Sequence, residues 1–139
     1  MSIGDVLDDA KTAIESLALT LSPTAINARN IPNTLADLVF SLSMQSTNSK
    51  KFRERSPGHI RYNHDLQVAL LGRMAPLDQF SSYTKLVNVE ESIIIALMTQ
   101  LKMPAYRVEY TGTRRTLTTS GEYLMLEILF SVEQSGGLL

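Results

Sequence analysis

The sequence predicts an α+β fold: a single, mainly antiparallel sheet of four or five strands with two helices packed on one face. Two segments repeat apolar residues at three- and four-residue steps, which is typical of amphipathic helices. Four segments alternate apolar and polar residues, which is typical of strands with one buried face. The 139 residues suffice for one core, so we expect a single domain over residues 1–139 in the order α-β-β-α-β-(β)-β.

The first helix is predicted over residues 3–21. Its apolar residues fall on one face: Ile3, Val6, Leu7, Ala10, Ile14, Leu17 and Leu21. Ser2 and Asp5 resemble a capping box, although Asp replaces the usual Glu or Gln. The pair Ser22-Pro23 is expected to end the helix, because the residue before a proline avoids helical geometry.

The next two strands are predicted over residues 38–45 and 60–70, separated by a long polar loop over residues 46–58. The second strand has the clearest alternation in the chain: Ile60, Tyr62, His64, Leu66, Val68 and Leu70 share one face. It spans roughly 40 Å at about 3.3 Å per residue, whereas a typical strand has about five or six residues. We therefore expect this strand to extend beyond the domain core.

The second half of the chain is predicted to add one helix and two or three strands. The elements are, in order, a connector over 74–82, a helix over 83–102, a strand over 106–110, a turn over 111–113, a threonine-rich segment over 114–119, a turn at 120–121, a strand over 123–132 and a flexible C-terminal tail over 134–139. Pro104 marks the end of the helix.

Apolar residues also lie on the second face of the predicted sheet, which the two helices do not cover. They are Leu71, Met125 and Leu129. In a two-layer domain this second face contacts water. Two interpretations stay open: scattered surface residues, or a surface that packs on a partner, which we favour.

Composition excludes several classes of protein. Lys and Arg total 13 and Asp and Glu total 14, so the formal net charge is −1, which does not fit a polyelectrolyte binder. The absence of cysteine excludes disulfide scaffolds, thiolate metal sites and cysteine nucleophiles. The longest apolar run, Ile93 to Met98, is too short to span a membrane, and Asp8 and Asp9 argue against a signal peptide. We expect a soluble, intracellular domain with no membrane contact.

The residues capable of catalysis or metal binding are not arranged for either. His59 and His64 are five residues apart, so on one strand they point to opposite faces; we interpret His64 as hydrogen-bonded near the core and His59 as solvated. Glu90 and Glu91 diverge by about 100° on a helix and are interpreted as part of a solvated first turn. No nucleophile elbow or phosphate-binding loop occurs. We predict that the protein is not an enzyme and has no catalytic, cofactor-binding or metal site.

Two basic features have alternative interpretations. Arg114 and Arg115 could hold a phosphate, but charges that protect an edge strand from aggregation explain them better. Tyr106 and Tyr110 flank Arg107, which is a weak version of the aromatic and basic pattern on sheets that bind nucleic acid.

Charge is distributed unevenly along the chain. Residues 1–40 carry a net charge of −3, residues 41–61 carry +4 and the remainder carries −2. The basic loop is either solvated or forms an attachment surface for an acidic neighbour, such as another copy of the protein. The candidate subunit or tube interface comprises the basic loop, the acidic first helix, an arginine pair and two leucines: Lys50, Lys51, Arg53, Arg55, Asp5, Asp8, Asp9, Arg114, Arg115, Leu138 and Leu139.

The order and hydrophobic texture of the elements, rather than a signature motif, are similar to those of a known family. After the first helix come IPNTLADLVFSLS at 31–43, IRYNHDLQVALLG at 60–72, TKLVNVEESIIIALMTQL at 84–101, YRVEYTGT at 106–113 and GEYLMLEILFSVEQ at 121–134. Nearly the whole chain thereby resembles the tail terminator (tail completion) proteins of tailed bacteriophages, the group that includes the lambda minor tail protein U.

The resemblance implies a hexameric ring that binds the last ring of the tail tube, stops tube polymerisation and offers a surface to the head connector or neck protein. It also implies a place in the virion at the tail-neck junction, assembly in the host cytoplasm, no cofactor, and passage of viral DNA through the lumen without sequence-specific binding. A ring needs a heterologous contact, which the acidic helix and the basic loop would supply. Two alternatives stay open: another neck or head–tail joining protein, and a small sheet-based nucleic-acid-binding module.

Overall fold

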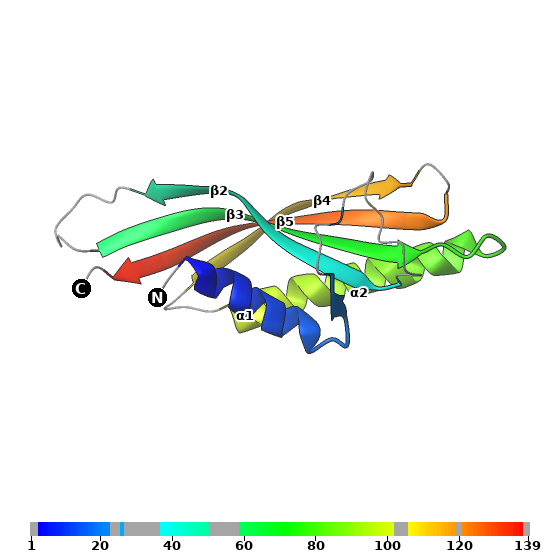
Figure 1. Ribbon diagram of the computed structural model, residues 1–139, viewed down its shortest axis with the longest axis horizontal. Coiled ribbons are helices and arrows are strands. Elements are labelled where there is room, and N and C mark those ends of the chain that lie inside the picture. The colour runs from blue at the N-terminus through cyan, green and yellow to red at the C-terminus, as the bar shows by residue number, and fades with distance from the viewer. Residues whose placement is uncertain are drawn as a thin grey trace.

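The computed structural model describes residues 3–22, 26, 37–50, 59–101, 106–118 and 121–137, with the backbone alone at 49–50, 59–61 and 135–137. Within these residues the chain forms two helices and five strands (Figure 1). In chain order they are α1 (Gly4–Glu15), β1 (Thr20–Leu21), β2 (Val39–Lys50), β3 (His59–Arg73), α2 (Gln79–Gln100), β4 (Tyr106–Leu117) and β5 (Tyr123–Gly137).

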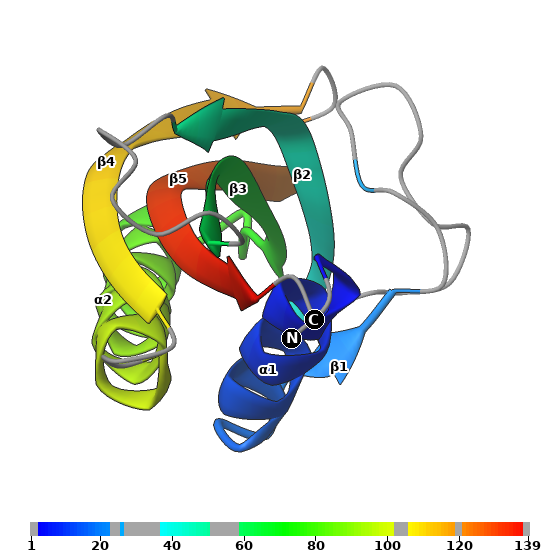
Figure 2. The ribbon, with the colours of Figure 1, turned by 90° about the vertical axis from the view of Figure 1, so that its left-hand side faces the viewer.

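The five strands belong to one sheet, in the order β1-β2-β3-β5-β4. β1 is parallel to β2, and the other three pairs are antiparallel. Both helices lie on the same side of this sheet (Figure 2), where they enclose the main core around Phe40, Leu70, Ile93 and Phe130. The predicted fold class, a mainly antiparallel sheet with two helices on one face, is confirmed.

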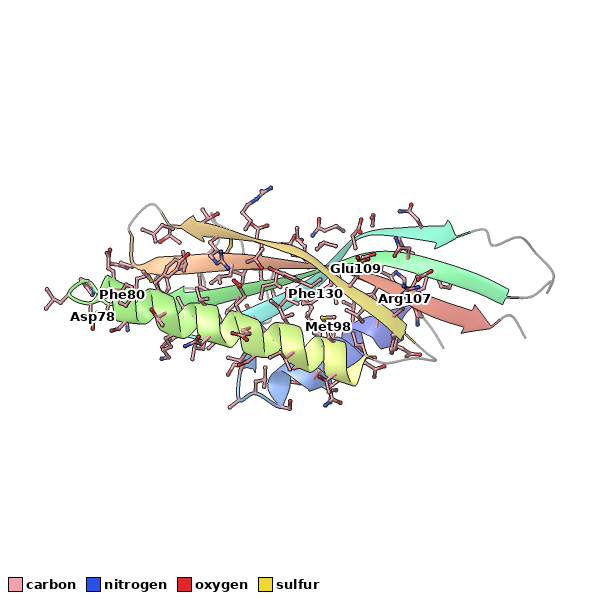
Figure 3. All side chains as sticks on the ribbon, turned by 180° about the vertical axis from the view of Figure 1, so that it is seen from behind. Asp78, Phe80, Met98, Arg107, Glu109 and Phe130 are labelled. Atoms are coloured by element: carbon pink, nitrogen blue, oxygen red, sulfur yellow. The ribbon has the colours of Figure 1, made fainter. Side chains whose placement is uncertain are left out.

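β3 and β5 are the long strands at the centre of the sheet. They pair without interruption from His59 opposite Gly137 to Arg73 opposite Tyr123, a span of roughly 50 Å at about 3.3 Å per residue. Together with β2 they form an end of the sheet that projects past the helices (Figures 1 and 3). This confirms the expectation that the long strand extends beyond the core.

Parts of two segments predicted as irregular are strand. β2 runs to Lys50, so the first part of the predicted loop 46–58 belongs to the sheet, and residues 51–58 lie outside the described residues. β5 runs to Gly137, so most of the predicted flexible tail 134–139 is also strand. Serine, asparagine and glutamine are weak strand formers, but β3 lies between the two segments and supplies both with backbone hydrogen-bond partners.

The first helix is shorter than the predicted range 3–21. α1 ends at Glu15, the chain reverses through Ala18, whose φ is 63°, and β1 follows. Leu19 is 6% exposed and Leu21 packs against the main core. The apolar residues that prolong the helical pattern are therefore buried by a turn and a short strand instead.

The two helices begin differently. The N-cap position of α1 is Ile3, which makes no side-chain cap hydrogen bond, and the predicted cap Ser2 lies outside the described residues. α2 begins at Gln79, ahead of the predicted start at residue 83. The reason is a cap: the carboxylate of Asp78 accepts a hydrogen bond of 3.1 Å from the backbone N–H of Ser81.

The predicted turn at 111–113 is instead a β-bulge within one strand. β4 pairs with β5 along its whole length, and its register shifts between Tyr110 and Gly112. Gly112 has a φ of 155°, a conformation that side chains disfavour and that is common at bulges. The segment predicted separately at 114–119 therefore continues the same strand through Leu117.

Side chains on the second face of the sheet form a small core of their own. Five residues, each less than a tenth exposed, make up this cluster: Ile26, Ala69, Leu71, Tyr123 and Met125. Ile26 belongs to the connection between β1 and β2, which brings it onto this face. The interpretation of Leu71 and Met125 as a partner surface is therefore wrong, because the chain buries both itself; Leu129 is 36% exposed.

Candidate interaction surfaces

A buried hydrogen-bonded network joins β2, β3 and β5 beside the main core. His64 on β3 is fully buried, and its Nε2 lies 2.8 Å from Oε1 of Gln134 on β5. Because that oxygen only accepts, Nε2–H donates, and Nδ1 accepts from Oγ1 of Thr47 on β2 at 2.9 Å. The ring of Tyr62 stacks on the imidazole with centroids 5.9 Å apart. The interpretation of His64 as a hydrogen-bonded residue near the core is confirmed, and the network fixes the register of the three strands.

The opposite face of the sheet at this level is also polar. The hydroxyl of Ser46 donates to Oδ2 of Asp65 at 2.5 Å, and that of Ser131 donates to Oδ1 of Asn63 at 2.9 Å. These bonds connect β3 to the strand on each side of it. Side-chain hydrogen bonds therefore join these three strands on both faces of the sheet.

The acidic residues of α1 are only partly available to a partner. Asp8 and Asp9 are exposed and Asp5 is half-buried. Oδ2 of Asp9 accepts a 2.6 Å hydrogen bond from the hydroxyl of Tyr106 on β4. Burial of the phenol is the main reason why the pKa of Tyr106 is raised, and this hydrogen bond is the second. Asp9 therefore helps to hold α1 to the sheet.

The interpretation of Glu90 as part of a solvated first turn is wrong. Glu90 lies in the middle of α2, is 5% exposed and accepts two hydrogen bonds from Arg115 of β4. Nη2 of Arg115 lies 2.7 Å from Oε2 and Nε lies 3.1 Å from Oε1, a bidentate ion pair. Its hydrogen bond to Glu90 raises the pKa of Arg115. Arg115 thus clamps β4 to α2, whereas the neighbouring Arg114 is exposed.

The remaining predicted interface residues are not brought together by the described structure. Lys50 is the last residue of β2, at the projecting end. The other basic candidates, Lys51, Arg53 and Arg55, lie outside the described residues, as do Leu138 and Leu139. Their assignment to an interface stays a prediction.

Exposed apolar residues at the start of α2 were missed by the sequence reasoning. Leu77 is fully exposed, Phe80 is 82% exposed and Tyr83 is 40% exposed. Phe80 borders a shallow groove of about 510 Å³ along α2, at the end marked by Asp78 in Figure 3. One signal in the sequence could have identified this surface. Phe80 is a large apolar residue that lies outside the predicted helix 83–102 and does not continue its apolar stripe.

Among the described residues, no three His, Asp or Glu side chains are grouped so as to hold a metal ion. No helix in the described ranges is long and apolar enough to span a membrane.

Comparison with known proteins identifies no family. No protein-family model matches the chain, and no curated protein matches it. One similar chain belongs to a solved structure described as "Virion of native gene transfer agent (GTA) particle". The two chains are 11% identical with a TM-score of 0.49, over 94% of this chain and 92% of that chain.

Proposed function

We propose that the protein is a structural component of a phage-like virion, a tail terminator that forms a ring on the end of the tail tube. The sequence resemblance supports this role over nearly the whole chain. The observation that carries the proposal is the projecting end of the sheet, where β2, β3 and β5 continue past both helices (Figure 1). A projecting, internally bonded element of this kind can reach an adjacent subunit or the tube.

The charges near this end fit a heterologous contact. β2 carries Lys50 to the projecting end, and Lys51, Arg53 and Arg55 follow it in the sequence. The first two turns of α1 carry Asp8 at the surface. A contact between a basic segment of one subunit and an acidic helix of the next joins two unlike surfaces, which is what ring closure requires.

In this role the protein acts through its surfaces and not by catalysis. It binds other copies of itself as a hexameric ring, the tail tube protein on one side and the head connector or neck protein on the other. The ring stops tube growth at the tail-neck junction, and viral DNA passes through its lumen without sequence-specific contacts.

Tube capping is the direct test. Tubes polymerised from the tail-tube protein of the same virion should stop growing when the protein is added, and negative-stain microscopy should show a ring at one end. The quadruple variant Lys50→Glu, Lys51→Glu, Arg53→Glu, Arg55→Glu should lose ring formation and capping while it keeps its fold, as measured by circular dichroism. The variant Arg73→Glu, Lys85→Glu is the control. It reverses two exposed charges away from the projecting end: Arg73 is the last residue of β3, and Lys85 of α2 lines the same surface pocket as Arg73.

Two outcomes would contradict the proposal. If the wild-type protein leaves tube length unchanged and binds no tube end, the terminator role is wrong. If the quadruple variant caps tubes as well as the wild type does, the basic segment is a solvated loop and not an attachment surface.

A further inference from the structure

Within the described residues, β4 is an open edge of the sheet. It pairs with β5 on one side, and no described strand pairs with its other side. Such an edge presents N–H and C=O groups that readily pair with another strand. The bulge after Tyr110 divides β4 into two regularly paired parts, and the regular part before the bulge is the segment Tyr106–Tyr110.

This regular part is complementary in charge to itself. It reads Tyr-Arg-Val-Glu-Tyr, so it is symmetrical about Val108 except that Arg107 and Glu109 exchange places. Two copies that pair antiparallel about Val108 put each Arg107 opposite the other copy's Glu109. Shifting the centre of pairing by one residue puts Arg107 opposite Arg107, or Glu109 opposite Glu109. The charges therefore select one register.

Both charged side chains are placed to make this contact. The ring of Tyr110 packs against Phe130, which lies in the main core, with ring centroids 5.8 Å apart. Because side chains alternate along a strand, Arg107 and Glu109 point to the face away from the helices. Both are exposed (Figure 3), and neither forms an ion pair with a described residue. They are available to a partner strand.

Apolar surface lies along the same margin of the molecule. α2 runs beside β4, and near its C-terminal end Ile95 is 57% exposed and Met98 is 48% exposed. Tyr110 is itself 36% exposed. A two-fold pairing of β4 leaves the helices of both copies on one face of the joined sheet, so this apolar margin faces its counterpart in the second copy.

We propose that β4 is a docking edge for a second copy of this chain, which pairs antiparallel with it about Val108. The two sheets then form one continuous sheet, held by backbone hydrogen bonds, two Arg107–Glu109 pairs and the apolar margin. This contact is isologous and closed, whereas a ring needs a heterologous contact. The inference does not rest on the proposed function, and its test uses the protein alone, without tail tubes.

Charge reversal tests the register. Arg107→Glu places two acidic residues opposite two acidic residues, and Glu109→Arg does the same with basic residues. Each variant should dimerise at least about tenfold more weakly than the wild type in analytical ultracentrifugation. An equimolar mixture of the two should form a heterodimer of wild-type strength, as should the double variant Arg107→Glu, Glu109→Arg. Arg114→Glu, on the far side of the bulge, is the matched control and should leave dimerisation unchanged.

A cysteine substitution tests the two-fold axis. The chain contains no cysteine, so Val108→Cys introduces a single thiol. Residues directly opposite one another in an antiparallel pair have Cα atoms about 4.5 or 5.5 Å apart, within disulfide range. Val108→Cys should form a covalent dimer on mild oxidation, whereas Thr116→Cys on the same strand should not. Thermal unfolding of each variant shows that its fold is kept.

Each alternative outcome overturns the inference. A wild-type protein that stays monomeric at every concentration shows that the edge does not dock a second copy. Single reversals that dimerise like the wild type show that Arg107 and Glu109 do not face each other. Single reversals that weaken dimerisation, without recovery in the mixture or the double variant, show that β4 meets a different surface.

Discussion

The clamp between α2 and β4 predicts an unequal response to the loss of its two partners. The carboxylate of Glu90 is buried, with 6% of its side chain exposed, whereas 36% of the Arg115 side chain is exposed. Replacing Arg115 by Met keeps the side-chain stem over Glu90 and leaves a buried carboxylate without a counter-charge. Replacing Glu90 by Gln leaves a cation that can turn into water. The first substitution should therefore cost more stability than the second.

The burial of each partner sets the magnitudes. Breaking a buried ion pair on one side costs about 3–5 kcal/mol, and partial exposure of Arg115 reduces this to about 2–3 kcal/mol for Arg115→Met. Glu90→Gln loses a charge-assisted hydrogen bond and should cost about 1 kcal/mol. For a chain of this size about 1 kcal/mol changes Tm by roughly 4 °C, so Arg115→Met should lower Tm by about 10 °C.

Urea unfolding of the single variants and of the double variant Glu90→Leu, Arg115→Met measures these differences. The double variant removes both charges together and should lie within about 1 kcal/mol of the wild type, because an apolar pair replaces an ion pair with little net loss. If Glu90→Gln is as destabilising as Arg115→Met, or if the double variant is the least stable, the burial of Glu90 does not determine the cost of breaking this ion pair.

Three further predictions concern the phenol of Tyr106, the close approach of Gly72 to Leu86, and the small core on the second face of the sheet. The raised pKa of Tyr106 means that its protonated form stabilises the fold below the unfolded pKa of about 10, and that this stability is lost as the pH rises through the folded pKa. Wild-type unfolding free energy should therefore fall more steeply than that of Tyr106→Phe as the pH rises above about 10. A Cβ on Gly72 would collide with the side chain of Leu86, so Gly72→Ala should cost about 1–3 kcal/mol in urea unfolding, and a neutral result would show that α2 moves away freely. Leu71→Ala should lower the free energy of unfolding by about 2–5 kcal/mol, as expected of a buried residue. A decrease below about 0.5 kcal/mol would show that Leu71 is a surface residue.

Some of the fold could be predicted because each pattern depends on one surface of one element. In β3, residues of one parity face the helices, so the alternation from Ile60 to Leu70 reports burial directly. The buried residues of α2, which include Leu86, Ile93 and Leu97, repeat at helical spacing for the same reason. His64 was identifiable because it is a polar residue on an otherwise apolar strand face.

Other features could not be predicted because they depend on a distant part of the chain. Glu90 lies at helical spacing between Leu86 and Ile93, which already points to the buried face, whereas its partner Arg115 is on a strand that no local pattern places beside α2. The bulge at Gly112 needs β5 as its reference, since a lone TGT segment fits a turn equally well. The candidate interface of basic and acidic patches is not decided by one chain alone.

The sequence by itself determined the α+β class, the long strand and the two helices, because a periodic pattern records which side of an element is buried. Only the tertiary structure decided where those elements end. The residues after Glu15 suit a helix or a strand, and pairing with Val39 and Phe40 makes Thr20 and Leu21 the strand β1. The polar residues at the ends of β2 and β5 have little strand preference of their own, and they become strand because β3 lies between them with its backbone hydrogen bonds available.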